Sequence, residues 1–258
     1  MAISDSEIRR AIELEGAVVV ENVLSQELAS ELRSAIVDAI EKDAAYHGNK
    51  SYGDYGMVLL CALYREVLRE ICGHSGLMQP FEAVMGEGCI IYAYTSSSMP
   101  PSDGNYSSRI HVDCPRHIPG YITNMGATIA LSDFTEENGA TYYLPRSFDR
   151  VTAPAEEEFF DNAKRFVAPA GSVLYFNART WHAGGVNKTD SWRHALTINM
   201  GRVWMKQRLD IPRALSHIDT TSLSPKALQK LGFLSQVPAS YDEYYAPVEK
   251  RKFKQRYE

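Results

Sequence analysis

Three residues could bind one metal ion: His111 and Asp113, which form an H-x-D motif, and His182 much later in the chain. Two imidazoles and one carboxylate form the facial triad that binds Fe(II) and leaves coordination positions open. Alternate residues of a β-strand point to the same face, so His111 and Asp113 can reach one ion while Val112 points away. The third ligand then comes from a distant strand. The pattern predicts an iron site at His111, Asp113 and His182.

A second H-x-D motif, at residues 217–219, serves as an internal control. No histidine follows Asp219, so this copy has no later ligand of the same kind. Its neighbours are rich in Ser, Thr and Pro, which are typical of turns. We therefore interpret this copy as a solvated turn, whereas strand-like segments surround the first.

The predicted strands begin near residue 89, where the hydrophobic period changes to two and β-branched and aromatic residues become frequent. Short strands separated by Gly and Pro are typical of a sandwich or jelly roll. In the last strand, Arg193, Thr197 and Asn199 share a polar face opposite an apolar one, which suits a strand with a polar interior face and a helix-covered outer face. We predict strands at 89–95, 109–113, 126–133, 141–144, 164–168, 172–177 and 192–204.

The part of the chain before these strands is predicted to be mainly helical. Ser4 and Glu7 have the spacing of a capping box, which predicts a short first helix. A strand is expected at 17–20, and a second helix begins at Ser25 with an apolar stripe at four-residue spacing. The apolar pattern of 57–72 predicts a third helix.

Helices followed by strands predict a single α+β domain with a mainly β core, in which the helices pack on one face of a double-stranded β-helix of the jelly-roll or cupin type. We assign a helical part to residues 1–88, the jelly-roll core to 89–205 and a C-terminal extension to 206–258. The polar segment 96–107 leads directly into the first metal ligand, so we expect a surface loop that can act as a lid.

Several further segments follow the H-x-D motif in a recognisable order. They are 126–141 (GATIALSDFTEENGAT), 142–147 (YYLPRS), 169–176 (PAGSVLYF), Trp181-His182 and Arg193. The earlier segment 16–28 (GAVVVENVLSQEL) matches as well. This order resembles the phytanoyl-CoA dioxygenase-like family of Fe(II)/2-oxoglutarate oxygenases, over about residues 10–205.

The sequence departs from the family pattern at two places. Residues 145–148 read PRSF where family members often have PGSH, and Ser108 stands where many members carry glutamine. Both positions border the expected pocket. The family's chemistry can therefore be carried over to this chain, but its substrate cannot.

The resemblance implies that Arg193 binds the distal carboxylate of 2-oxoglutarate through its guanidinium fork. A buried arginine needs an anionic partner, although a local salt bridge is an alternative explanation. Thr141 would donate its hydroxyl to the same carboxylate, and Thr128 and Thr197 are further candidates. Strand propensity is the alternative reason for these threonines.

Three other residues are candidates for contact with a substrate. Arg116 and His117 follow the H-x-D motif, and Arg146 replaces a glycine of the family pattern. Ordinary surface charge is the alternative interpretation for all three.

The composition is that of a globular protein, with 258 residues, 45% hydrophobic and 23% charged, and a formal net charge of −5. This charge gives no support for nucleic-acid or membrane binding, and there is no apolar leader or membrane-spanning run. The four cysteines form no C-x-x-C pair or zinc spacing, which indicates reduced thiols in a cytoplasmic protein. The oligomeric state cannot be read from the sequence.

Together these features predict an Fe(II)- and 2-oxoglutarate-dependent oxygenase, with O2 as cosubstrate and succinate and CO2 as products. The substrate would be a small organic molecule, such as a specialised metabolite, oxidised at an unactivated C–H bond by hydroxylation, desaturation or ring closure. The alternative is a jelly-roll metal-binding protein or metalloenzyme that does not use 2-oxoglutarate. Halogenases that resemble the family carry Gly or Ala at the position of Asp113, so halogenation is not expected.

Overall fold

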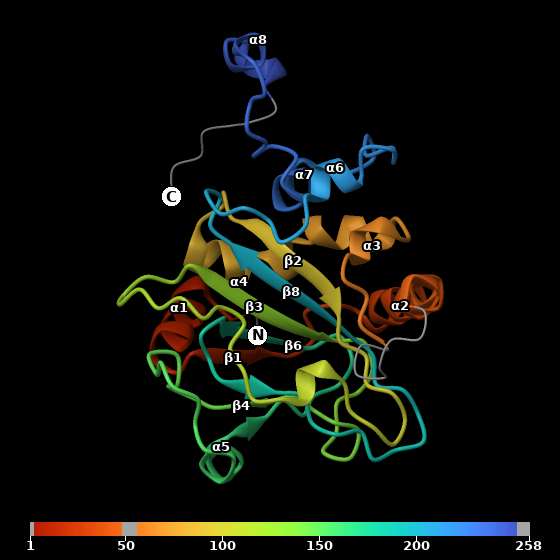
Figure 1. Ribbon diagram of the computed structural model, residues 1–258, viewed down its shortest axis with the longest axis vertical. Coiled ribbons are helices and arrows are strands. Elements are labelled where there is room, and N and C mark those ends of the chain that lie inside the picture. Colours follow the sequence, from red (N-terminus) through yellow and green to blue (C-terminus); the bar gives the residue numbers. More distant parts are fainter. Residues whose placement is uncertain (1–2, 48–55, 252–258) are drawn as a thin grey trace.

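The computed structural model describes residues 3–47 and 56–251 and combines helices with two antiparallel sheets (Figure 1). The larger sheet has the strand order β1–β6–β3–β8–β2, and the smaller has the order β5–β4–β7. The larger comprises β1 (Ala17–Val20), β6 (Val173–Asn177), β3 (Asn124–Ala130), β8 (Ala195–Gly201) and β2 (Ile90–Ser96). The smaller comprises β5 (Lys164–Arg165), β4 (Tyr142–Tyr143) and β7 (His182–Ala183).

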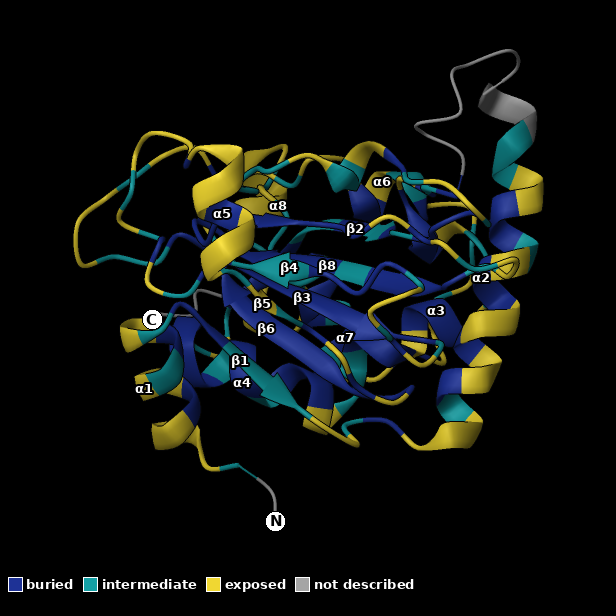
Figure 2. Ribbon diagram, turned by 90° about the horizontal axis from the view of Figure 1, so that it is seen from below, coloured by how far each residue is buried: buried dark blue, intermediate teal, exposed yellow. Residues whose placement is uncertain are grey.

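The N-terminal helices cover one face of the larger sheet. They are α1 (Asp5–Leu14), α2 (Gln26–His47), α3 (Val67–Glu70) and α4 (Ser75–Met85). Their apolar residues, such as Ile12, Leu32 and Phe81, form one core with the outward-facing strand residues Tyr175 and Ile198. Figure 2 shows the result for α2, whose sheet-facing side is buried and whose other side is exposed.

The two faces of β8 differ as its sequence predicts. Leu196, Ile198 and Met200 belong to the core beneath the helices. Thr197 and Asn199 point to the opposite face, where both line a cavity. A second apolar cluster, which includes Phe134 and Phe166, fills part of the space on that inner side.

The prediction of one helix over 57–72 is wrong. This segment contains a 3-10 helix at Cys61–Leu63, then α3 and a second 3-10 helix at Ile71–Gly73. Its backbone bonds partly to β2 instead: Leu60 pairs with Tyr94, and the Val58 N–H donates to the Ser96 hydroxyl at 2.8 Å. The helix that follows, α4, was not predicted, and it accommodates Pro80.

Several predicted strands are shorter than expected, and 109–113 is not a regular strand. His111 forms a single antiparallel bridge with His182, after which the chain turns because the N–H groups of Asp113 and Cys114 both donate to the Ala178 carbonyl. The segment 164–168 is reduced to β5, together with an isolated bridge between Ala168 and Phe134.

The segment 96–107 is less exposed than its polar sequence suggests. Ser98 and Met99 are fully buried, and Met99 pairs with Arg193 through two backbone hydrogen bonds of 2.8 and 3.1 Å. Asn105 is buried as well and donates to the Ser98 carbonyl at 2.8 Å. The expectation of a wholly surface loop is therefore wrong, although Tyr106 at its end is half exposed.

The remaining helices are α5 (Glu156–Asn162), beside the smaller sheet, and α6 (Ile211–Ala214), α7 (Pro225–Lys230) and α8 (Tyr241–Tyr244) in the C-terminal extension. Ala227 of α7 joins the main core, and α8 projects away from the body in Figure 1. Among the described residues, no helix is long and apolar enough to cross a membrane. Most of the basic tail at 250–254 lies outside the described residues.

Candidate metal centre

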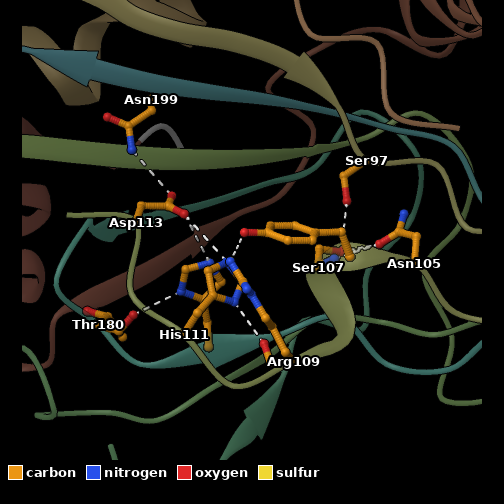
Figure 3. A network of polar contacts seen from close by, with 10 residues as sticks. Ser97, Asn105, Ser107, Arg109, His111, Asp113, Thr180 and Asn199 are labelled. Carbon is orange, nitrogen blue, oxygen red and sulfur yellow. Dashed lines mark hydrogen bonds and ion pairs between the residues drawn. The ribbon is translucent and has the colours of Figure 1, made fainter. Parts of the chain in front are cut away.

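The structure brings His111, Asp113 and His182 together, with one potential ligand atom of each within 4.8 Å of the others (Figure 3). The Asp113 Oδ1 lies 3.6 Å from the His111 Nε2 and 3.7 Å from the His182 Nε2. No other such group of three metal-ligating residues occurs in the described part of the chain. Two imidazole nitrogens and one carboxylate oxygen are a suitable donor set for Fe(II).

The backbone fixes the orientation of both histidines. The N–H of each donates to the carbonyl of the other at 2.9 Å, which places the two side chains next to each other. The His111 Nδ1 lies 2.8 Å from the Arg109 carbonyl, and the His182 Nδ1 lies 2.9 Å from the Thr180 carbonyl. Each Nδ1 therefore carries the proton, and each Nε2 lone pair points toward Asp113.

An amide chain orients the Asp113 carboxylate. Asn199 of β8 donates to the Asp113 Oδ2 at 3.3 Å, and Asn124 of β3 donates to the Asn199 Oδ1 at 3.0 Å. Oδ1 is thereby left to face the two histidines. Strand alternation predicted that Asn199 faces inward, but its pairing with Asp113 depends on the turn after His111 and could not be read from the sequence.

Arg179 holds the turn that follows Asp113, a role that the sequence did not suggest. It is buried, and its guanidinium donates to the carbonyls of Pro115 at 3.0 Å, Phe148 at 3.1 Å and Arg150 at 2.7 Å. One side chain thus ties three loop positions together around the site.

The protonation states of the triad suit metal binding. Burial lowers the pKa of His182 to about 4, so its imidazole is neutral near pH 7. Burial alone would raise the pKa of Asp113, but His182, His111 and Asn199 outweigh it and lower the pKa. Burial also opposes the protonation of His111, but the Asp113 carboxylate outweighs this and raises its pKa. A cation near Asp113 is therefore favoured.

A cavity of about 530 Å³ opens on the triad. Of the four predicted cosubstrate residues, Thr128, Thr141 and Thr197 line it. Thr95 lines it too and lies in one row with Thr197 and Thr128, because β2 and β3 both pair with β8 at that level. Thr95 was not predicted, since only the strand register places it there.

Arg193 is not among the lining residues, but it bonds to Ser97, which is one of them, and Arg193 is only 1% exposed. Its guanidinium donates to the carbonyls of Ser97 at 3.2 Å and Gly139 at 3.3 Å and lies 4.3 Å from the Phe134 ring centroid. Its Nε has no hydrogen-bond partner, and none of the described carboxylates forms an ion pair with Arg193. Burial lowers its pKa to about 9. A buried cation without an anion fits a site for the carboxylate of a bound molecule.

The three candidates for substrate contact do not line the cavity. Arg116 is exposed, His117 pairs with Asp149 at 3.0 Å, and the Arg146 Nε donates to Glu15 at 2.9 Å. The cavity lining instead includes several residues that belong to no recognised motif. These are Met57, Leu59, Tyr92, Tyr106, Arg109 and Arg208.

The control motif behaves as expected. The Asp219 carboxylate accepts from the N–H of Thr221 at 2.9 Å and from its hydroxyl at 2.7 Å, which is the geometry of a local turn. His217 and Asp219 belong to none of the metal-ligating groups found among the described residues.

Comparison with known proteins supports the resemblance seen in the sequence. The family model for phytanoyl-CoA dioxygenase matches residues 12–195. The chain is 27% identical over 256 residues to an uncharacterized protein of Mycobacterium tuberculosis, with 96% of this chain and 94% of that protein covered. It is 25% identical to the dioxygenase aneA of Aspergillus aculeatus, with 77% and 72% covered.

Solved structures of non-heme oxygenases share the fold. The non-heme monooxygenase ThoJ matches with a TM-score of 0.65 at 19% identity, covering 78% of this chain and 80% of that one. The alpha-ketoglutarate-dependent carbocyclase SnoK from nogalamycin biosynthesis matches with a TM-score of 0.61 at 22% identity, covering 78% and 85%.

Proposed function

We propose, because the chain belongs to the phytanoyl-CoA dioxygenase family, that it is an Fe(II)- and 2-oxoglutarate-dependent oxygenase of a small organic metabolite. The observation that carries this proposal is Arg193, a buried guanidinium with an unpaired Nε that bonds to Ser97 in the lining of the cavity that opens on the triad. In this proposal the two sheets form a double-stranded β-helix, and the triad lies inside it. The four free cysteine thiols suit a cytoplasmic protein.

His111, Asp113 and His182 would hold the iron, which when bound supplies the O2 chemistry that no side chain can perform. Asp113 contributes the negative charge, and the Asn124–Asn199 amide chain keeps its Oδ1 directed at the histidines. The Nδ1–H bonds to carbonyl groups keep both rings fixed while ligands exchange.

Arg193 would bind the distal carboxylate of 2-oxoglutarate, because no described acid forms an ion pair with the arginine. Thr141, and with it Thr128 and Thr197, would donate hydroxyl groups to the same molecule. The overall reaction converts 2-oxoglutarate, O2 and a C–H bond to succinate, CO2 and an alcohol. In desaturation or ring closure the substrate loses two hydrogen atoms, and the oxygen atom leaves as water and is not inserted into the substrate.

The alternative is a metal site that does not use 2-oxoglutarate. The buried, anion-free Arg193 argues against it, because a site for metal alone has no use for such a costly group. Succinate formation separates the two functions. Protein with Fe(II), 2-oxoglutarate and O2 should form succinate, omission of any one should stop it, and His182→Ala should remove it. Metal-dependent turnover of a substrate without 2-oxoglutarate would favour the alternative.

A further inference from the structure

Two arginines from distant parts of the chain line the cavity. Arg109 lies two residues before the first metal ligand, and Arg208 lies in the loop that follows β8. The N–H of Arg208 donates to the Tyr92 carbonyl at 2.8 Å, which anchors this loop to β2. Both residues are largely exposed to solvent, so their guanidinium groups can reach a molecule that enters.

No described acid forms an ion pair with either arginine. Asp113 is the one carboxylate among the lining residues, and its partners are the two histidines and Asn199. The Arg208 guanidinium forms no hydrogen bond or ion pair with the described residues, and Arg109 contacts the ring and hydroxyl of Tyr106. The whole chain carries a formal charge of −5, so it is not basic overall.

Apolar side chains form another part of the cavity lining. Met57, Leu59 and Ala93 line the same cavity, and Leu59 remains 46% exposed at its edge. A hydrocarbon group would cover this surface, which water now contacts. The cavity lining thus combines exposed apolar surface with two cations.

We propose that the substrate is an organic oxyanion, with an apolar body and a carboxylate or phosphate group that Arg208 binds with help from Arg109. This inference rests on the proposed function, because it assigns the substrate class of the same site. Arginine suits this role since its planar fork matches both carboxylate and phosphate oxygens.

This anion site is separate from the one at Arg193. The β2–β8 register pairs Ser96 with Leu196 near Arg193, whereas Ala93 pairs with Asn199 beside the triad. Arg208, held at Tyr92, therefore lies toward the other end of these strands. The cavity would hold one anion at each end, with the metal ligands between them.

The test uses three six-carbon probes that differ only in their head group: hexanoate, hexyl phosphate and uncharged hexanol. Binding is measured by ligand-observed NMR titration on protein saturated with Ni(II) and 2-oxoglutarate, so that Arg193 is already occupied. Each anionic probe that fits should bind about five- to tenfold more tightly than hexanol, as charged hydrogen bonds at a partly exposed site allow. A preference for hexanoate would identify a carboxylate, and a preference for hexyl phosphate would identify a phosphate.

Arg208→Gln should abolish this preference. Arg116→Gln removes the same charge from an exposed arginine outside the cavity and should leave it unchanged. Equal binding of all three probes, an undiminished preference in Arg208→Gln or an equal loss in Arg116→Gln would overturn the inference. The titration is repeated without Ni(II) and 2-oxoglutarate. If the protein does not bind 2-oxoglutarate, the proposed function is refuted. The repeated titration still measures the effect of Arg208 on probe binding.

Discussion

Replacing Arg193 with methionine should strongly weaken the binding of 2-oxoglutarate and leave the metal-free fold as stable as before, or more stable. In the structure the guanidinium donates only two long hydrogen bonds, of 3.2 and 3.3 Å, and no carboxylate from the described residues compensates its burial. Methionine has a similar length and carries no charge to bury. Replacing a poorly compensated buried charge by an apolar side chain is often neutral or stabilising.

The expected loss of affinity follows from the burial of the arginine. Removing one partner of a desolvated, hydrogen-bonded charge pair costs about 2–5 kcal/mol, and about 1.4 kcal/mol corresponds to a factor of ten. The dissociation constant of 2-oxoglutarate should therefore rise by about 30-fold to a few thousand-fold. Arg193→Lys should recover part of this loss, because it restores the charge but not the planar fork.

The assay is calorimetric titration of Ni(II)-loaded protein with 2-oxoglutarate, together with urea denaturation of the metal-free protein. Arg202→Met is the matched control, since Arg202 is also buried but donates to the carbonyls of Ile122 and Met85, outside the cavity lining. An unchanged 2-oxoglutarate affinity in Arg193→Met would refute the assignment. So would an equal loss in Arg202→Met at unchanged stability.

Three further predictions concern the metal ligands, the effect of pH and the exclusion of halide. His111→Ala, Asp113→Ala and His182→Ala should each lower iron content and succinate yield together while the circular dichroism spectrum stays that of the wild type; near-normal turnover in the His182 variant would contradict the triad. Burial, with smaller contributions from Arg33 and Arg193, lowers the pKa of His194 from 6.5 to about 4, so between these values the unfolded chain holds a proton that the folded chain does not. The free energy of unfolding of the metal-free protein should then fall as the pH drops from about 6.5 to about 4, by up to about 3 kcal/mol from this group, and urea denaturation should show a shallower fall in His194→Gln. Because the Asp113 carboxylate takes the place that a halide would need, mass spectrometry of the product formed in chloride or bromide buffer should show no halogen isotope pattern, and its appearance would mean that Asp113 is not a ligand.

The sequence predicted those site residues that lie on one strand with alternating polar and apolar residues. The alternation around Arg193 predicted which side chains of β8 face inward, and the structure places Thr197 and Asn199 in the cavity lining. His111 and Asp113 share one candidate metal site although 109–113 is not a regular strand. The backbone pairing of His111 with His182 positions them in place of a strand.

What could not be anticipated depends on contacts between distant segments. Arg179 and Asn124 orient the site through hydrogen bonds to residues remote in sequence, and no local motif marks either of them. The segment 57–72 has a helical apolar pattern, yet pairing of Leu60 with β2 interrupts it. Arg208 reaches the cavity only because its loop bonds to Tyr92, whereas Arg116, closer in sequence to the ligands, points elsewhere.

The fate of O2 tests the central claim most directly. A single turnover is run with protein, Fe(II) and 2-oxoglutarate in equal amounts under isotopically heavy O2, and the succinate is analysed by mass spectrometry. Oxidative decarboxylation at the triad predicts succinate that carries one labelled oxygen atom, CO2 in equal amount, and neither product from Asp113→Ala. Recovery of intact 2-oxoglutarate from iron-loaded wild-type protein, or succinate without label, would contradict it.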